Sequence, residues 1–426
     1  MKYNKFVMNG GKVGVFLGMK KIVAILIFCY VNDRLSAQYF KETAIQKHIS
    51  FLASDKLKGR GTSSPEELLT ANYIAAEFKK AGLTAFNKSY LKPFSFKKNL
   101  DPHDTSLANV KERFSNNVVG FLDNKAPYTI VIGAHYDHLG LGHDRNSLDA
   151  NPEGKIHNGA DDNASGTTGV IELAHFFSSN KKTEPYNFLF ICFSGEELGL
   201  LGSKKWCDNP DIDLKTVNYM VNMDMIGRLN DSTHKLIVYG VGTSPSFVPL
   251  IDNIRTQLSI KKDSAGIGPS DQTSFYLKDI PVLHFFTGQH SDYHKPSDDA
   301  EKVNYKGEVE VLNYIVSIIE KTFESPKLSF SSTRAPESSN MSFKVTMGVM
   351  PDYTFEGPGM RIDGVTDNKP AFKAGVLKGD IVKKLGDVEV KDVMTYMKAL
   401  SKYKKGDSTT VEVLRNGETK VLDLTF

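Results

Sequence analysis

Two adjacent glutamates, Glu196 and Glu197, follow an apolar run at residues 188–193 that predicts a fully buried strand. Neighbouring side chains on extended backbone point in opposite directions, so the two carboxylates can have different tasks. One can bind a metal ion while the other moves protons to and from water. A Glu-Glu pair without further chemistry nearby would ordinarily be two solvated acids at a strand-to-helix turn.

Other candidate ligands occupy similar places along the chain. His135 and Asp137 end a first apolar strand, Asp224 ends a third, and Asp162 lies in the glycine-bounded loop 159–166 that opens a helix. His294 follows later, in the run 291–296. Because ligands bind beyond the carboxyl ends of parallel strands, four of these five elements are expected to face one crevice. Two imidazoles and three carboxylates are the ligand set expected of paired zinc ions with one bridging carboxylate.

The charges of such a site balance. Two Zn²⁺ ions carry four positive charges, three carboxylates remove three, and one hydroxide removes the last. Three carboxylates without metal in a partly buried site would repel one another. Imidazole and carboxylate ligands favour zinc over magnesium.

The elements that position these residues alternate between helix and strand. Strands are expected at 128–134, 188–193, 217–223 and 280–286, and helices at 43–52, 65–81, 171–177 and 198–206. Strands that are apolar throughout and alternate with helices predict an α/β fold. Its mostly parallel, twisted sheet is flanked by helices on both faces. Only about 45 residues, 83–127, precede the first catalytic strand, which is too few for a separate inserted domain.

Composition excludes several classes of protein. Hydrophobic residues make up 40% of the 426-residue chain and charged residues 24%, as in an ordinary globular protein. A net charge of +3 with scattered lysines argues against nucleic acid as a partner. Residues 1–37 read as a signal peptide, with Met19-Lys20-Lys21 before an apolar run that is too short to span a bilayer. We therefore expect a periplasmic or extracellular bacterial protein without a membrane span in the mature chain. The start codon is left open between Met1 and Met19.

The quoted stretches resemble the M28 zinc peptidases, the group of bacterial leucyl-type aminopeptidases, over roughly residues 40–325. That resemblance implies the zinc exopeptidase fold. It also implies that His135, Asp162 and Asp224 hold one zinc ion, and that Asp162, Glu197 and His294 hold the other.

The same resemblance assigns the remaining roles. Glu196 is the general base and acid, Asp137 orients His135 by accepting its second N–H, and Tyr293 stabilises the tetrahedral oxyanion. Gln272 stands where several relatives carry His, which affects the substrate pocket more than the metal site. Other candidates are expected to be structural or rim-lining, namely Asp161, His138, His143, His157, His284 and His290.

Composition changes near Pro326, and we divide the chain into a signal peptide (1–37), a peptidase domain (38–325), a linker (326–340) and a second domain (341–426). The second domain resembles a small, β-rich PDZ domain. Its loop at 355–362 looks like the glycine-rich loop that captures a peptide's C-terminal carboxylate beside an open strand edge. Pro358 removes one N–H donor there, so a packing module without peptide binding is the alternative.

The leading hypothesis is a secreted di-zinc exopeptidase that acts on peptide or protein substrates, most simply an aminopeptidase. A glutaminyl cyclase-like acyltransferase with a single zinc, on the same fold, is one alternative. A non-catalytic binding protein is another. Neither the preferred N-terminal residue nor the oligomeric state follows from the sequence.

Overall fold

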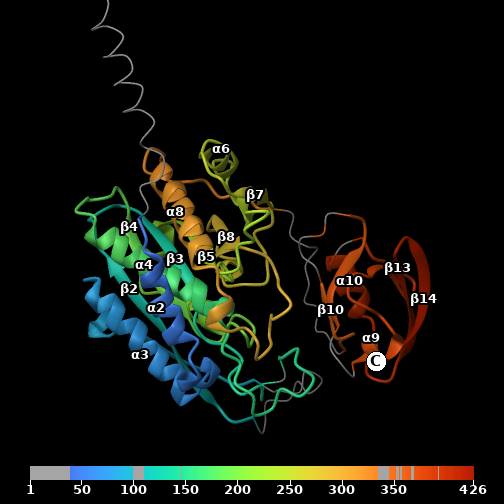
Figure 1. Ribbon diagram of the computed structural model, residues 1–426. Coiled ribbons are helices and arrows are strands. Elements are labelled where there is room, and N and C mark those ends of the chain that lie inside the picture. The colour runs from blue at the N-terminus through green and yellow to red at the C-terminus, as the bar shows by residue number, and fades with distance from the viewer. Residues whose placement is uncertain are drawn as a thin grey trace, which may run out of the picture. The chain divides into compact units, whose positions relative to one another are not determined.

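The computed structural model in Figure 1 describes residues 39–98, 110–144, 146–333, 345–351, 355, 357–365, 369–391 and 393–426. The expected signal peptide and residues 334–340 of the expected linker lie outside this part of the chain. Two structural regions follow one another along the described chain, and each is considered by itself.

Helices and strands alternate in the first region, as the sequence predicts. Its helices are α2 (Glu42–Leu52), α3 (Pro65–Lys80), α4 (Gly166–Ser179), α5 (Leu201–Asp208), α6 (Phe247–Asp252), α7 (Gln272–Tyr276) and α8 (Tyr305–Thr322). Its strands are β1 (Leu91–Phe96), β2 (Arg113–Leu122), β3 (Thr129–His135), β4 (Asn187–Phe193), β5 (Val217–Met223), β6 (Lys235–Tyr239), β7 (Ser259–Lys262) and β8 (Val282–Phe286).

Helix α3 begins where its sequence provides a cap. Pro65 occupies the first turn, and the Ser64 side chain accepts a hydrogen bond from the Glu67 N–H at 3.0 Å. The Glu67 carboxylate accepts a hydrogen bond from the Ser63 N–H. In an ordinary capping box it would accept from the N–H of the cap residue itself, Ser64. The helix ends at Lys80, just before Gly82, which adopts a positive φ of 75°.

The eight strands form one sheet in the order β1-β2-β4-β3-β5-β8-β6-β7. The four central strands β4, β3, β5 and β8 run parallel. Antiparallel pairing occurs toward the edges, between β1 and β2, β2 and β4, and β6 and β8. The expected α/β class with a mostly parallel central sheet is confirmed.

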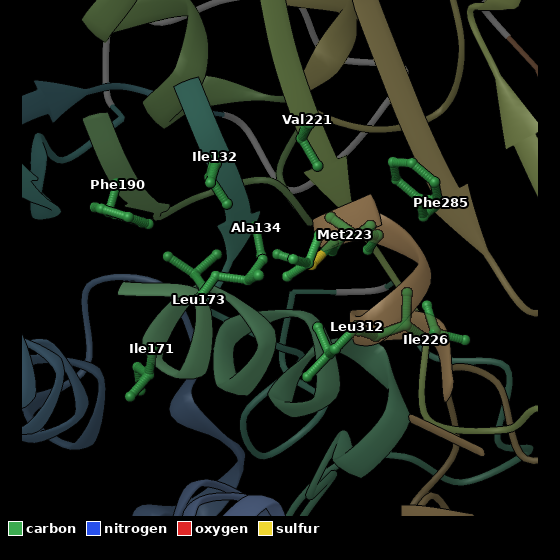
Figure 2. Packing of buried hydrophobic residues seen from close by; sticks show 14 of the residues in the cluster. Ile132, Ala134, Ile171, Leu173, Phe190, Val221, Met223, Ile226, Phe285 and Leu312 are labelled. Atoms are coloured by element: carbon green, nitrogen blue, oxygen red, sulfur yellow. The ribbon is translucent and has the colours of Figure 1, made fainter. Parts of the chain in front are cut away.

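Both faces of the sheet are buried, so β3, β4 and β5 are inaccessible along their whole length. On one face, Ile132, Phe190 and Val221 pack against Leu173 of α4 and Leu312 of α8, as Figure 2 shows. Alternate residues of the same strands pack on the opposite face with residues of α5 and α7. The continuous apolar runs are therefore explained by helices on both sides.

The described residues between 83 and 127 form β1 and β2, which both join the sheet. Residues 328–333 of the expected linker lie against the peptidase region. The Leu328 N–H donates to Asn218 Oδ1 at 2.7 Å, and the Ser331 N–H donates to the Thr243 carbonyl at 2.8 Å.

The second region has its own core and its own sheet in the order β14-β13-β11-β10-β9, with β12 paired to β11. Its strands are β9 (Val349–Pro351), β10 (Met360–Val365), β11 (Ile381–Leu385), β12 (Val388–Glu389), β13 (Ser408–Arg415) and β14 (Glu418–Thr425). Its helices are α9 (Pro370–Ala374) and α10 (Val393–Leu400).

The pairing of β10 bears on the strand edge expected beside the carboxylate-binding loop. Strand β10 pairs with β11 at Met360 and Arg361 and with β9 from Ile362 to Val365. The strand at that end of the described sheet is β9.

No helix in the described part of the chain is both long and apolar enough to cross a membrane. Cys192 and Cys207 are buried free thiols, as expected from their separate places on a strand and a helix.

Candidate metal centre

The expected ligands lie at the carboxyl edge of the central parallel strands. His135 is the last residue of β3, Asp224 directly follows β5, and Glu197 lies shortly beyond β4. Asp162 lies in the tight turn Ala160–Ser165 that opens α4, and His294 lies in the loop after β8. Because adjacent parallel strands end at the same edge, residues far apart in sequence converge there.

The donor atoms form two groups that share Asp162. His135 Nε2 lies 3.4 Å from both Asp162 Oδ1 and Asp224 Oδ1. His294 Nε2 lies 3.2 Å from Asp162 Oδ2 and 3.1 Å from Glu197 Oε2. Ligand atoms about 2.0–2.1 Å from a tetrahedral zinc ion are about 3.3 Å apart. The spacing of both groups therefore suits a metal ion, with one Asp162 oxygen for each.

Both imidazoles are oriented for this task by main-chain carbonyls. His135 Nδ1 lies 3.1 Å from the Asp137 carbonyl oxygen, and His294 Nδ1 lies 2.9 Å from that of Asn146. In the tautomer that satisfies these contacts, Nδ1 carries the hydrogen and donates it. Each Nε2 is then left with a lone pair directed at the carboxylates, which is the arrangement that a metal-binding histidine needs.

Burial and charge set the protonation of the carboxylates. Burial alone would raise the pKa of Glu197, but His294 nearby and a hydrogen bond from His138 lower it to about 2. Burial would likewise raise the pKa of Asp162, and the surrounding histidines hold it well below its usual value. Both groups are therefore ionised, as metal ligands must be.

Glu196 differs from its neighbour Glu197. Burial, with the charges of Glu197 and Asp224 added, raises the pKa of Glu196 well above its usual value, although His135 opposes the shift. Adjacent carboxyl groups whose pKa values are pushed apart in this way are typical of an acid–base pair with divided roles.

Asp137 lies where it can accept the second N–H of the His135 ring, through its main-chain oxygen. Its carbonyl oxygen is the nearer acceptor for the His135 ring, whereas its carboxylate Oδ1 lies 3.8 Å from Nδ1. The carboxylate instead accepts hydrogen bonds from Thr62 Oγ1 at 2.7 Å and from the Glu196 N–H at 3.2 Å. Asp137 therefore links the first ligand to the backbone of Glu196.

Tyr293 lies against the second ligand group. Its ring stacks on His294 with 3.9 Å between ring centroids. Burial raises its pKa well above the usual value, and the charges of Asp162 and Glu197 add to the shift. The phenol therefore stays protonated and can donate a hydrogen bond.

His138 lies closer to the centre than the sequence indicated. Its Nδ1 is 2.8 Å from Glu197 Oε1 and 3.8 Å from Asp162 Oδ2, so these three residues could also enclose an ion. The short distance to Glu197 is that of a hydrogen bond, whereas the distances around His294 Nε2 suit metal ligands. We therefore favour His294 as the ligand and His138 as the donor that holds Glu197.

Asp298 and Asp271 are buried acids that the sequence analysis did not single out. Asp298 Oδ2 accepts hydrogen bonds from the N–H groups of Asp161 and Asp162, both at 3.0 Å, so it ties Asp162 to the loop that carries His294. Burial raises the pKa of Asp271 to about 7, with the nearby charges of Asp137 and Asp224 contributing. Nothing in their spacing distinguishes either acid from a surface residue.

Other polar residues near the centre have contacts with the surrounding fold. Asp161 accepts from the Gly227 N–H at 2.7 Å and lies 3.1 Å from His290 Nε2. His157 Nε2 contacts Ser147 Oγ at 2.7 Å. Gln272 and His284 both contact the Asn222 side chain in a buried polar cluster.

Comparisons with known proteins agree with this geometry. Residues 117–319 match the model of peptidase family M28, and residues 337–426 match the model of the PDZ domain. The chain therefore carries an M28 peptidase domain followed by a PDZ domain. The M28 domain contains all five expected ligands, and the expected family and PDZ resemblance are confirmed.

Curated relatives of this M28–PDZ chain match it over part of its length. The alkaline phosphatase isozyme conversion protein of Escherichia coli (strain K12) is 33% identical over 171 residues, covering 39% of this chain and 46% of the relative. Aminopeptidase YwaD of Bacillus subtilis (strain 168) is 29% identical over 204 residues, covering 45% of this chain and 41% of the relative. The matches span less than half the length of both relatives.

Solved structures share the fold of the M28 domain. A zinc aminopeptidase from Bacillus subtilis aligns with a TM-score of 0.53 and 17% identity, covering 68% of this chain and 98% of the other. Glutaminyl cyclase from Porphyromonas gingivalis aligns with a TM-score of 0.53 and 13% identity, covering 66% and 99%. The expected zinc exopeptidase fold is confirmed, and the fold alone does not separate hydrolysis from cyclisation.

Proposed function

We propose that the protein is a secreted di-zinc exopeptidase, an aminopeptidase that releases N-terminal residues from peptides. One observation carries the proposal, namely two groups of donor atoms that share Asp162 and have separations of 3.1–3.4 Å. A glutaminyl cyclase-like centre with a single zinc ion needs only one such group of donor atoms.

In this proposal His135, Asp162 and Asp224 hold one zinc ion, and Asp162, Glu197 and His294 hold the other. The ligand chemistry fits zinc, because neutral imidazoles and ionised carboxylates are its usual oxygen and nitrogen donors. Relatives named a probable zinc metalloprotease and a zinc aminopeptidase support the same metal. Zinc supplies a Lewis acid that polarises the scissile carbonyl and makes water more acidic.

The protein's own residues would then move protons and hold charges. Glu196 takes a proton from the attacking water and passes it to the leaving amine, as a general base and then a general acid. Tyr293 donates its O–H to the oxyanion that develops on the scissile carbonyl. Asp137 orients His135 through its carbonyl oxygen and holds the Glu196 backbone through its carboxylate.

Two measurements test this function. We expect two zinc ions per chain by elemental analysis of protein purified without chelator. We also expect release of the fluorophore from aminoacyl substrates, and loss of that release when the N-terminus is acetylated. Fewer than one zinc ion per chain would favour a non-catalytic binding protein. Ammonia release from an N-terminal glutaminyl peptide without hydrolysis would favour a cyclase.

We further propose that residues 1–37 direct export to the periplasm or the exterior, and that the PDZ domain binds peptide C-termini. The described strand at one end of the PDZ sheet is β9, which supports peptide addition there. A fluorescent-peptide binding assay with free and amidated C-termini tests the second proposal, since carboxylate capture requires a preference for the free acid.

A further inference from the structure

Arg60 is a buried cation close to the metal centre. Its residue has no solvent exposure, and no carboxylate in the described residues forms an ion pair with it. Burial lowers its pKa to about 10, and the charges of Asp162 and Asp137 partly oppose the shift. A buried cation without a direct partner is costly, so its contacts must provide compensation.

Those contacts are four main-chain carbonyl oxygens on three separate segments. Nε donates to Tyr136 at 2.8 Å, Nη2 donates to Gly159 at 3.0 Å, and Nη1 donates to both Leu52 at 2.7 Å and Asn158 at 2.5 Å. Tyr136 lies between His135 and Asp137, while Asn158 and Gly159 shortly precede Asp162. The planar guanidinium therefore spans the two loops that carry His135 and the bridging carboxylate.

The main chain around Arg60 is also fixed to the loop after β3. We call residues 59–62 the strap. The His138 N–H donates to the Arg60 carbonyl at 3.2 Å, the Gly140 N–H donates to that of Gly59 at 3.0 Å, and Thr62 Oγ1 donates to the Asp137 carboxylate at 2.7 Å. The strap thus contacts Asp137, His138 and Gly140, which follow the first ligand along the chain.

The backbone of the strap and of Lys58, which precedes it, costs energy by itself. Lys58 and Arg60 have φ values of 41° and 49°, in the left-handed region that non-glycine residues rarely adopt. Only glycine fits at position 59, because a Cβ there would lie 2.3 Å from the His157 carbonyl oxygen and 2.6 Å from that of Gly140. Such a conformation persists only where surrounding contacts determine it, and it is common beside functional sites.

We infer that Arg60, held by the strap, is a positioning residue that sets the separation of the two ligand-bearing loops and thereby the spacing of His135 and Asp162. This role rests on the proposed metal centre. Arg60 touches no ligand side chain and acts only through main-chain carbonyls.

The direction in which zinc affinity changes tests the inference, because lost charge and lost geometry have opposite effects. Removing a positive charge near the carboxylates strengthens cation binding by Coulomb's law. Weaker zinc binding after loss of Arg60 can therefore come only from lost geometry. Lysine keeps the charge but cannot reach four carbonyls with a planar fork, so it should not restore the spacing.

The experiment measures the zinc dissociation constant of the full chain by competition with a chromophoric chelator, well below the unfolding temperature of each variant. We expect Arg60→Met and Arg60→Lys each to weaken zinc binding by about 10- to 100-fold, as for other residues that orient metal ligands. Arg255→Met is the matched control, because it removes an exposed arginine and the same charge. It should stay within about twofold of the wild type.

Zinc binding in Arg60→Met that equals or exceeds the wild type would overturn the inference. If neither Arg60 variant folds, Thr62→Val loosens the other end of the strap. It should weaken zinc binding by about fivefold, and unchanged affinity would then refute the inference. Failure of the proposed function is separate: a wild-type protein that binds less than one zinc refutes the metal centre itself, whereas zinc binding without peptide cleavage leaves the role of Arg60 standing.

Discussion

Replacing each member of the glutamate pair in turn should separate catalysis from metal binding. The side chains of Glu196 and Glu197 differ in their contacts, although the residues are adjacent. Glu197 Oε2 lies 3.1 Å from His294 Nε2, and Oε1 accepts from His138 at 2.8 Å. The Glu196 carboxylate makes no such contact to a ligand within the described residues, and its main-chain N–H is held by Asp137.

Glu196→Gln should retain both zinc ions and lose turnover. Glutamine has the same size and preserves the main-chain contact to Asp137, but it cannot take a proton. General acid–base groups contribute about 10²- to 10⁴-fold to a rate, which corresponds to about 3–5 kcal/mol of transition-state stabilisation. We therefore expect kcat to fall by that factor at unchanged zinc content.

Glu197→Gln should weaken one of the two zinc ions. The single oxygen of the glutamine amide can contact either the metal or the His138 N–H. The NH₂ group then faces whichever of these two partners the oxygen does not contact. Loss of one such contact and of one negative charge should weaken binding by at least about tenfold, or about 1.4 kcal/mol. Chelator dialysis should then remove one ion and leave the His135 group filled.

Elemental analysis and aminoacyl fluorogenic turnover on the same preparations provide the test. Equal loss of zinc from both variants would refute the division of roles. So would a Glu196→Gln protein whose kcat stays within about threefold of the wild type.

Three further predictions concern stability. Phe190 is fully buried on β4, so Phe190→Ala should lower the free energy of unfolding by about 3–5 kcal/mol in urea titrations. The buried Asp380 carboxylate accepts two hydrogen bonds from Arg415, each at 2.7 Å. Asp380→Asn should therefore destabilise the PDZ domain by about 3 kcal/mol, seen as a lower unfolding temperature at unchanged zinc content. Burial raises the pKa of Glu67 from 4.5 to about 8, so the folded protein binds this proton more tightly and stability should fall as pH rises between these values. Glu67→Gln should reduce the slope of the free energy of unfolding against pH, measured by urea titrations, by up to about 1.4 kcal/mol per pH unit. An unchanged slope would contradict this assignment.

The central strands could be predicted because they are apolar along their whole length. The expected strand at 217–223 coincides with β5, that at 128–134 is shifted from β3 by one residue, and that at 188–193 begins one residue later than β4. Strands β1, β2, β6 and β7 were not predicted, since β2 contains Asn116 and Asn117 and these strands lie toward the edges of the sheet, where pairing decides the structure. Helix α8 was also not predicted, although Val309, Leu312, Val316 and Ile319 recur at helical spacing.

The convergence of the five expected ligands could be predicted because strand ends in a parallel sheet share one edge. The residues around them could not. Arg60 reaches Tyr136 and Gly159 across 76 and 99 positions of chain, through carbonyl groups that every residue possesses. His138 differs from other histidines only through its contact with Glu197, which lies 59 residues away. Such contacts depend on how loops pack, and short-range patterns do not encode them.

The distribution of the ligands along the chain has a consequence for how the protein matures. His135 and His294 meet only when β3, β5 and β8 have paired and the final loop has closed over them. For the proposed metal centre, a partly folded chain would hold at most a fragment of the ligand set, so we expect high-affinity metal uptake late in folding. The free energy of metal binding then adds to the free energy of unfolding of the finished domain alone. If the chain is exported as we propose, assembly of the proposed metal centre would then wait until the chain has reached its destination.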